Sequence, residues 1–359
     1  MSANRKRKPK LPTWAHQPAL YAVKAFVELI NAVGLEDAVP AMRSMGAAFA
    51  KLPFNRKRIE RAASNLAWCF PHMSEPQRID LAIESYRHLF RLVAEVAVAP
   101  RALNLDTWPD HIALTDYTPV TDRLDRKQPT LLITGHYGNW ELLGHAIALL
   151  GYPMYALYRP LDMKPLDDYL RDVRADCGIK IIDKFGATHL LPPLIDAGEP
   201  VAFVADQNAG DRGLFVPFFD RLASAYKSIG VLAMRHNANI AVGAAHRIGE
   251  NLKYRVDIVD IFGPDDWNTH PDPLFYITAR YRYAIETGVS RAPEQYLWIH
   301  RYWKSRPRHE RAGQPFPSRL REKIEALPWM TEERIKRIVE RSAADAATFA
   351  EEFPDRVIR

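Results

Sequence analysis

The sequence predicts an α/β fold in which a largely parallel central sheet is flanked by helices, with a helical N-terminal region and a helical C-terminal tail. Short apolar runs such as TLLITG (130–135) and PVAFVAD (200–206) have the length and composition of buried strands. Segments with helical spacing, 165–178 and 188–198, alternate with these runs and end in glycine, as helix C-termini often do. Strands that alternate with helices are typical of parallel sheets, which bind ligands beyond the carboxyl ends of their strands. Further runs with strand character are 153–159, 179–184, 239–248 and 253–262.

The chain of 359 residues divides into three regions by its pattern. Residues 1–110 are predicted to be helical, and Ser74 with Gln77 three residues later predicts a helix start. Residues 111–307 hold the strand runs and form the predicted catalytic core. Residues 308–359 are polar with helical spacing and are predicted to be a peripheral helical extension.

The segment 18–35 is predicted to be an amphipathic helix that associates with a membrane. Lys24, Glu28 and Asn31 form one polar stripe, and the remaining surface is apolar. Basic residues precede this segment and suit anionic headgroups. Because no run of 18 apolar residues exists, we expect peripheral or monotopic attachment and not a spanning helix. The alternative is a helix packed on the protein's own core.

Composition narrows the classes of function. Two cysteines, Cys69 and Cys177, do not form a disulfide framework or a cysteine-based zinc site. The net charge of +6 suits anionic lipid or an acidic protein partner. Nucleic acid is not expected, because no recognised binding module is present. The basic stretch PFNRKRIER (53–61) either steers an acidic carrier protein or is a solvated helix face, and the aromatic stretch YLWIHRYW (296–303) either lines a pocket or fills the core.

The stretch GHYGNWE predicts an active site. If a strand ends at residue 134 and a helix begins near 140, His136 lies beyond the strand's carboxyl end and Glu141 in the first helical turn, with Asn139 as N-cap. Gly135 and Gly138 allow a tight turn and close approach by a substrate. A histidine held by a carboxylate is suited to general base catalysis. No GxSxG motif is present, so the hydroxyl to be deprotonated is expected to belong to a substrate.

Two other interpretations of this stretch stay open. In the first, His136 and Glu141 have only a structural role at a junction between a strand and a helix. In the second, His136, Glu141 and His145 bind a metal. The spacing argues against the metal, because metal-binding histidines on one helix lie at i and i+4. No metal and no cofactor are therefore expected.

Five stretches, in order, resemble the bacterial lipid A biosynthesis acyltransferases (the lauroyl and myristoyl transferases) of the lysophospholipid acyltransferase superfamily. GHYGNWE resembles the superfamily's H-x4-D/E motif, which is a weak signal when it occurs alone. The ordered set, which covers roughly residues 20–307, is far more specific. The other four stretches are SNLAWCFPHMS (64–74), ALYRPLDMKPLDDYLRDVRADCGIKII (156–182), VADQNAGDRGLFVPFFDRLAS (204–224) and YLWIHRYWKSRP (296–307).

The resemblance implies a glycerolipid acyltransferase-like fold and an O-acyltransferase activity. Such enzymes move a fatty acyl chain from an acyl thioester to a hydroxyl of a membrane glycolipid, here a lipid A precursor or a related lipid. It also implies acyl carrier protein, or a coenzyme A thioester, as donor. The expected location is the cytoplasmic face of the bacterial inner membrane. Family members usually begin with a more hydrophobic anchor helix than segment 18–35.

The resemblance also implies roles for particular residues. His136 is the general base and Glu141 holds it. Arg174, in the stretch 156–182, clamps a phosphate; the alternative is an ion-paired surface residue. Asp206 lies at a strand's carboxyl end; the alternative is a residue that caps a turn. An oxyanion is expected to be stabilised by backbone amides of residues 135–138 or by an unidentified side chain. The predicted substrate-binding residues are Arg159, Gly135, Gly138, Asn139 and Gln207.

Three other functions are compatible with the same residues. The first is an acyltransferase whose acceptor is another lysolipid or a mannosylated phosphoinositide. The second is a thioester or lipid hydrolase, in which water replaces the acceptor. The third is a protein that binds lipid without catalysis.

Overall fold

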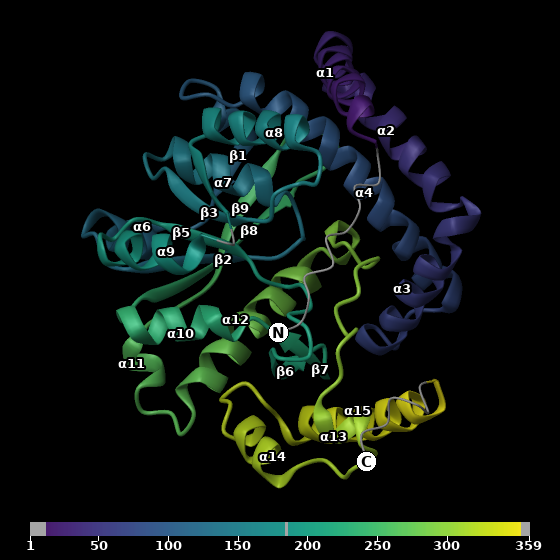
Figure 1. Ribbon diagram of the computed structural model, residues 1–359, viewed down its shortest axis with the longest axis vertical. Coiled ribbons are helices and arrows are strands. Elements are labelled where there is room, and N and C mark those ends of the chain that lie inside the picture. The colour runs from purple at the N-terminus through teal and green to yellow at the C-terminus, as the bar shows by residue number, and fades with distance from the viewer. Residues whose placement is uncertain (1–11, 184–185, 353–359) are drawn as a thin grey trace.

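The computed structural model describes residues 12–183 and 186–352, and a seven-stranded sheet lies at its centre (Figure 1). The strand order is β1-β9-β8-β2-β5-β3-β4. All neighbouring strands are parallel except β8 and β9, so the predicted, largely parallel sheet is confirmed. The six predicted strand runs each form a strand. The strands are β1 (Ile112–Leu114), β2 (Thr130–Thr134), β3 (Met154–Tyr158), β4 (Ile179–Asp183), β5 (Val201–Val204), β8 (Asn239–Arg247) and β9 (Tyr254–Phe262).

Helices cover both faces of the sheet. Residues of α9 (Ala187–Asp196), α10 (Lys227–His236) and α12 (Pro273–Arg291) pack against one face in the main core cluster. Residues of α6 (Thr118–Asp125) and α7 (Trp140–Leu149) pack against the other face. Every residue of β2 is buried, because this central strand is covered on both faces.

The turns after two predicted helices have the expected geometry. Gly178 and Gly198 follow α8 (Lys164–Asp176) and α9, with φ values of +76° and +70°. At Gly198 a Cβ would lie 2.2 Å from the carbonyl oxygen of Lys127, so only glycine fits there.

A two-stranded hairpin was not predicted. β6 (Leu214–Phe218) and β7 (Arg221–Ala225) pair antiparallel, outside the main sheet. Their turn residues, Phe219 and Asp220, both have φ near +51°, a conformation that sequence reasoning expects of Gly or Asn. The sequence of this turn therefore does not predict a hairpin. Packing of β6 against α12 stabilises the hairpin.

The N-terminal region is helical, as predicted, and the Ser74–Gln77 capping box is present. Helices α2 and α4 pack along each other on one side of the sheet domain (Figure 1). The helices are α1 (His16–Val33), α2 (Leu35–Ala50), α3 (Arg56–Cys69), α4 (Glu75–Ala102) and α5 (Trp108–His111), and the short remaining ones are α11 (Pro264–Trp267), η1 (Thr13–Ala15), η2 (Pro53–Asn55) and η3 (Pro293–Gln295).

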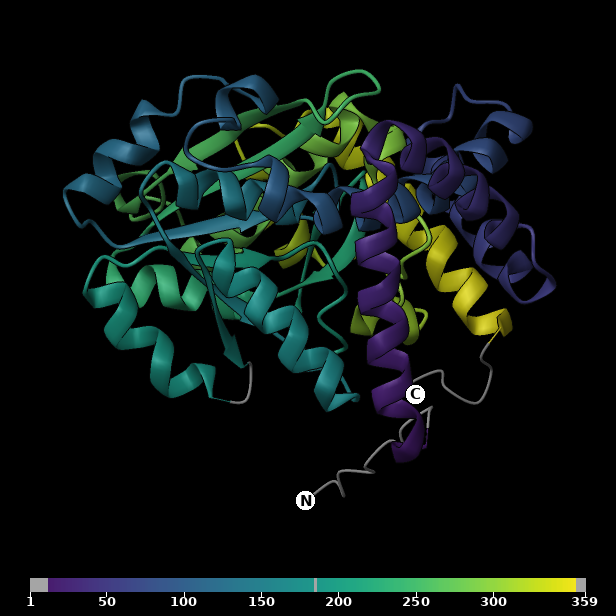
Figure 2. The same cartoon turned by 90° about the horizontal axis from the view of Figure 1, so that it is seen from above.

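The polar stripe of α1 is turned toward the protein. Lys24 lies over a tyrosine ring of α8, Glu28 pairs with an arginine of α4 at 3.0 Å, and Asn31 donates to a backbone carbonyl of α4 at 3.4 Å. Figure 2 shows α1, in purple, with its N-terminal turns standing clear of the rest of the molecule. The helix thus packs on the protein through one side only.

The solvent-facing side of α1 also carries apolar residues. Tyr21 and Leu29 of α1 are 67% and 58% exposed, and Trp14 in η1, just before it, is 78% exposed, although such side chains are usually covered. Tyr21 and Leu29 lie about 80° apart around the helix, next to the edge of the polar stripe. Within residues 12–183 and 186–352, no helix is both long enough and apolar enough to cross a membrane.

The C-terminal tail is helical, as predicted, but buried charges join it to the core. It comprises α13 (Arg308–Arg311), α14 (Ser318–Glu325) and α15 (Glu332–Glu352). Asp345 of α15 accepts from Arg221 of β7 at 2.7 Å and from Arg306 at 2.7 Å. Ile338 of α15 is 1% exposed and belongs to the main core cluster. The prediction of a merely peripheral extension is therefore wrong for this helix.

Candidate functional site

His136 and Asp206 meet at the carboxyl end of the sheet. His136 follows β2 and Asp206 follows β5, and these two strands are parallel neighbours. The Nδ1 of His136 lies 2.7 Å from Oδ1 of Asp206, and the His136 backbone N–H donates to Oδ2 at 2.8 Å. The Asp206 side chain is fully buried, whereas the His136 side chain is 19% exposed. The carboxylate that orients His136 is therefore Asp206.

The expectation that Glu141 holds His136 is wrong. Glu141 lies in the first turn of α7, as predicted, but its oxygens accept two hydrogen bonds from Arg174 of α8, at 2.9 and 2.7 Å. Arg174 in turn lies over the ring of Tyr158, 5.0 Å from its centroid. The strand-to-helix turn directs Glu141 toward α8, and a bidentate guanidinium is the stronger partner there. Arg174 is therefore not paired with its sequence neighbours.

Asp206 is ionised at neutral pH. Burial by itself would raise the pKa of this carboxyl group, but the charge and the hydrogen bonds of His136 lower the pKa to about 2. Arg282 of α12 also contributes, since it lies beneath the site and donates to the backbone carbonyls of Ala205 and Asp206. Arg282 is fully buried and stacks on Phe218 at 4.0 Å, so it fixes the backbone that carries the carboxylate.

The outer nitrogen of His136 is arranged to accept a proton. The Nε2 of Gln207 lies 3.3 Å from Nε2 of His136. An ionised carboxylate only accepts, so Nδ1 of His136 carries the hydrogen bonded to Asp206, and in the neutral ring Nε2 is then the acceptor. The rings of Trp140 and His300 flank His136, with centroids 4.9 and 5.3 Å away. Gln207, which was predicted to bind substrate, thus lies against the outer nitrogen of His136.

The loop residues predicted to bind substrate have structural roles. Asn139 is fully buried and caps α7 by accepting from the amide of Leu142 at 2.9 Å. At Gly138, with φ of +56°, a Cβ would lie 2.0 Å from the carbonyl oxygen of Ala245. At Gly135 a Cβ would lie 2.9 Å from the Tyr137 ring. These contacts are with the protein itself, and a substrate-binding role of the three residues stays a prediction.

The amides of this loop are also largely occupied. The His136 amide donates to Asp206, the Gly138 amide to the carbonyl of Gln295 at 2.9 Å, and the Asn139 amide to Ala245 at 2.9 Å. The expected oxyanion stabilisation by residues 135–138 therefore lacks two of its donors.

An apolar cavity of about 750 Å³ opens beside His136. Its polar lining residues include four predicted ones, Glu141, Arg159, Arg174 and Gln207. It extends between the sheet and the two helices α6 and α7 toward the amino ends of the strands, where Tyr152 lines it. The remaining lining is mostly aliphatic, for example Leu132, Leu143, Ile147, Met154, Ile179 and Ile258. This shape and chemistry suit a hydrocarbon chain.

The aromatic stretch 296–303 fills the core and does not line this cavity. Tyr296, Trp298 and Tyr302 are at most 1% exposed, and the rings of Tyr296 and Tyr302 stack at 4.9 Å. His300, in the same stretch, does not line the cavity either, but its ring faces that of His136. Sequence reasoning missed His300 as a site residue, although it lies in the last of the five stretches that resemble the family, residues 296–307.

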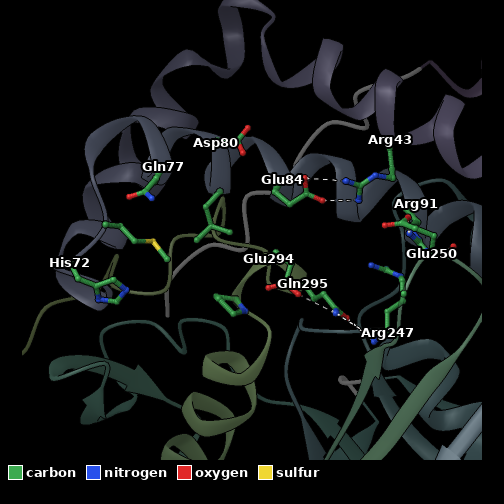
Figure 3. Close-up of a pocket in the computed structure, with 14 residues that line it drawn as sticks. Arg43, His72, Gln77, Asp80, Glu84, Arg91, Arg247, Glu250, Glu294 and Gln295 are labelled. Atoms are coloured by element: carbon green, nitrogen blue, oxygen red, sulfur yellow. Dashed lines mark hydrogen bonds and ion pairs between the residues drawn. The ribbon is translucent and has the colours of Figure 1, made fainter.

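A second, polar cavity of about 760 Å³ lies where α4 meets the end of β8 and η3 (Figure 3). Its charged residues are paired: Arg43 with Glu84 at 2.7 Å, and Arg91 with Glu250 at 2.7 Å. Arg247 at its wall pairs with Glu95, a buried residue that also bonds Asn139. These bonds connect the cavity wall to the cap of α7. Among the described residues, no group of three or more His, Cys, Asp or Glu side chains is placed to hold a metal ion.

Comparison with known proteins matches this site to one family. The family model described as bacterial lipid A biosynthesis acyltransferase matches residues 7–305. The chain belongs to this family. It is therefore an acyltransferase of lipid A biosynthesis, with a lipid acceptor and an acyl donor. His136, Asp206, Gln207 and His300 all lie within the matched range, whereas α13, α14 and α15 lie beyond it.

Individual members of the lipid A acyltransferase family are distant relatives of this chain. The lipid A biosynthesis palmitoleoyltransferase of Escherichia coli K12 is 28% identical over 263 residues, which are 71% of this chain and 81% of that protein. The lauroyltransferase of the same organism is 26% identical over 279 residues, 75% of this chain and 87% of that protein. A Haemophilus influenzae lipid A biosynthesis acyltransferase is 26% identical over 280 residues, 75% of this chain and 86% of that protein.

Proposed function

We propose that this enzyme transfers a fatty acyl chain directly from an acyl thioester to a hydroxyl of a lipid A precursor, with His136 as general base. The observation that carries the proposal is the pair of contacts on the His136 ring. Asp206 fixes Nδ1, and Nε2 lies at the mouth of an apolar cavity. A base in this position contributes about two to four orders of magnitude in rate.

The proposed reaction balances without a covalent enzyme intermediate. Nε2 of His136 takes the proton of the acceptor hydroxyl, and the oxygen forms a bond to the thioester carbonyl carbon. The tetrahedral intermediate collapses, the carbon–sulfur bond breaks, and the thiolate takes the proton from His136. Asp206 stays ionised throughout and stabilises the imidazolium. Family members use different acyl groups, and the aliphatic cavity holds the chain in this scheme.

Three features support the rest of the proposal. The exposed basic residues at the start of α3, Arg56, Lys57 and Arg58, suit an acidic acyl carrier protein as donor. Arg174 and Arg159 at the cavity mouth suit a phosphate of donor or acceptor, and Nη1 of Arg174 is buried without a partner among the described residues. The exposed apolar face of α1 supports peripheral attachment to the cytoplasmic face of the inner membrane.

The test is product analysis by mass spectrometry. Bacterial membranes and an acyl carrier protein thioester are incubated with the wild-type protein or with His136→Ala. We expect an acylated lipid A precursor with the wild-type protein only. Release of free fatty acid without any acylated lipid would replace transfer by hydrolysis. Acylation of a different lipid would correct the acceptor, and equal product with both proteins would remove His136 from the mechanism.

The cavity predicts an effect on chain length. Ala202 of β5 lines the middle of the cavity, so Ala202→Leu shortens the space for a chain. We expect the ratio of kcat/KM for long over short acyl donors to fall about tenfold, since one to two buried methylenes correspond to about 0.8 kcal/mol each. Competition assays with donors of graded length measure this ratio. An unchanged ratio would place the chain elsewhere.

The face of α1 predicts an effect on membrane binding. The double substitution Tyr21→Asp and Leu29→Asp puts charges on the exposed apolar face and is expected to weaken binding to anionic vesicles at least tenfold. Co-sedimentation measures this binding. The matched control is Leu190→Asp on α9, which changes a leucine that is 52% exposed away from α1 and should leave binding unchanged. Equal losses for both variants would contradict a specific role of α1.

A further inference from the structure

We infer that His300 stabilises the oxyanion of the reaction, by donating a hydrogen bond from its neutral ring to the former carbonyl oxygen of the thioester. This inference rests on the proposed function. It names a side chain that adds a hydrogen-bond donor for the oxyanion to those of the loop after β2. An oxyanion donor is needed in acyl transfer because negative charge develops on that oxygen as the acceptor attacks.

Three amides of this loop are occupied by the fold. Those of His136, Gly138 and Asn139 donate to Asp206, Gln295 and Ala245. These three amides are not free to bind an oxyanion, and a side chain on a neighbouring segment adds a donor.

His300 is the side chain in the right place. Its ring centroid lies 5.3 Å from that of His136, at an interplanar angle of 54°. Neither of its ring nitrogens has a hydrogen-bond partner within the part of the chain that the structure describes. A donor beside the general base suits a tetrahedral intermediate, because the oxyanion forms on the carbon that the deprotonated hydroxyl attacks.

The segment that carries His300 is fixed relative to His136. The amide of Leu297 donates to the carbonyl of His136 at 3.2 Å, and residues 137 and 296 form an isolated β-bridge. The hydroxyl of Tyr302 donates to the carbonyl of Leu297 at 2.9 Å. Because the two rings are tied through backbone contacts, His300 is preorganised and needs no reorganisation as charge develops.

The charge state of His300 suits a donor and excludes a second base. Burial lowers its pKa to about 4, and the neighbouring His136 acts in the same direction. At neutral pH the ring is therefore uncharged and carries one N–H. A neutral ring donates a hydrogen bond without giving up its proton, so His136 remains the group that transfers protons.

The other polar groups nearby are less suited. The amide of Gln207 donates to Nε2 of His136, the atom that must meet the acceptor hydroxyl. Arg174 is held by Glu141 through two hydrogen bonds. In the proposed step the carbonyl π electrons move onto oxygen as the new C–O bond forms, and His300 donates to that oxygen. When the C–S bond breaks, the electrons return and the thiolate takes the proton held by His136.

Two substitutions separate a donor from a packing residue. His300→Phe keeps a ring and removes the N–H, whereas His300→Asn loses the ring and keeps an N–H. We expect His300→Phe to lower kcat by about 10²–10³ with a small effect on KM, and His300→Asn to retain at least ten times the kcat of His300→Phe. His300→Gln is a second variant that keeps an N–H donor, on a side chain longer than that of His300→Asn. Thermal unfolding of each variant checks that it is folded.

The readout is release of thiol from an acyl carrier protein thioester, because transfer and hydrolysis share this step. If His300→Phe is as active as the wild-type protein, or if neither His300→Asn nor His300→Gln has a higher kcat than His300→Phe, the inference is wrong. If the wild-type protein itself releases no thiol, the proposed function fails, and this failure is distinct from that of the inference.

Discussion

Asp206→Asn is expected to lower kcat by about 10³–10⁴, while Glu141→Gln lowers it no more than about tenfold. Asp206 accepts two hydrogen bonds from His136, one from the ring and one from the backbone. An asparagine at this position has one acceptor oxygen, and its NH₂ group meets a second donor. The ring then favours the tautomer with hydrogen on Nε2, which cannot take a proton from the acceptor.

Glu141→Gln acts through a different contact. It weakens the bidentate bond to Arg174 at the cavity mouth, so its main effect is expected in KM for the substrate that Arg174 contacts. Steady-state kinetics with saturating donor and acceptor separate the two parameters. If Glu141→Gln reduces kcat as strongly as Asp206→Asn, then Glu141 and not Asp206 serves His136 during catalysis.

Asp345→Ala is expected to lower the free energy of unfolding by about 3–5 kcal/mol, because it removes the carboxylate that the largely buried Arg221 and Arg341 bind. Asp345 accepts from Arg221 and Arg306 at 2.7 Å each and from Arg341 at 3.1 Å. The side chains of Arg221 and Arg341 are 15% and 10% exposed, so water replaces the lost carboxylate poorly, whereas Arg306 keeps Glu310 as a partner. Chemical denaturation monitored by tryptophan fluorescence measures the change.

The same helix supplies a matched control. Glu340 of α15 is 64% exposed and lies 3.9 Å from Lys336, so Glu340→Ala is expected to change stability by less than about 0.5 kcal/mol. Similar losses for the two variants would mean that α15 is stabilised by its helical charge pattern and not by its buried ion pairs. A neutral Asp345→Ala would show that the core is independent of the tail.

The ion pairs of α15 also lie close to the active-site loops. Arg306 directly follows Ser305, which exchanges two hydrogen bonds with Asn208, at 3.2 and 3.3 Å. Asn208 is two residues from Asp206. The tail beyond the family match thus helps to hold the segments that carry Asp206 and His300.

Local sequence signals determined most of the elements. Alternation of apolar runs and helical segments predicted the sheet, because burial on both faces requires long apolar stretches in central strands. Glycines after helices and the Ser74–Gln77 box predicted helix ends, because these residues satisfy terminal backbone groups of their own helix. The N-cap Asn139 was predicted for the same reason.

The sequence by itself determined that His136 lies in a loop at the carboxyl end of a strand, since this depends on residues within one short stretch. Only the tertiary structure decided which carboxylate serves it. Glu141 is five residues away in the chain, but Asp206, 70 residues away, is closer in space because β2 and β5 are neighbours in the sheet. The tertiary structure also decided that His300 lies beside His136 and that the polar stripe of α1 contacts the protein. Spacing along a chain fixes which residues share an element, whereas packing between elements fixes which side chains meet.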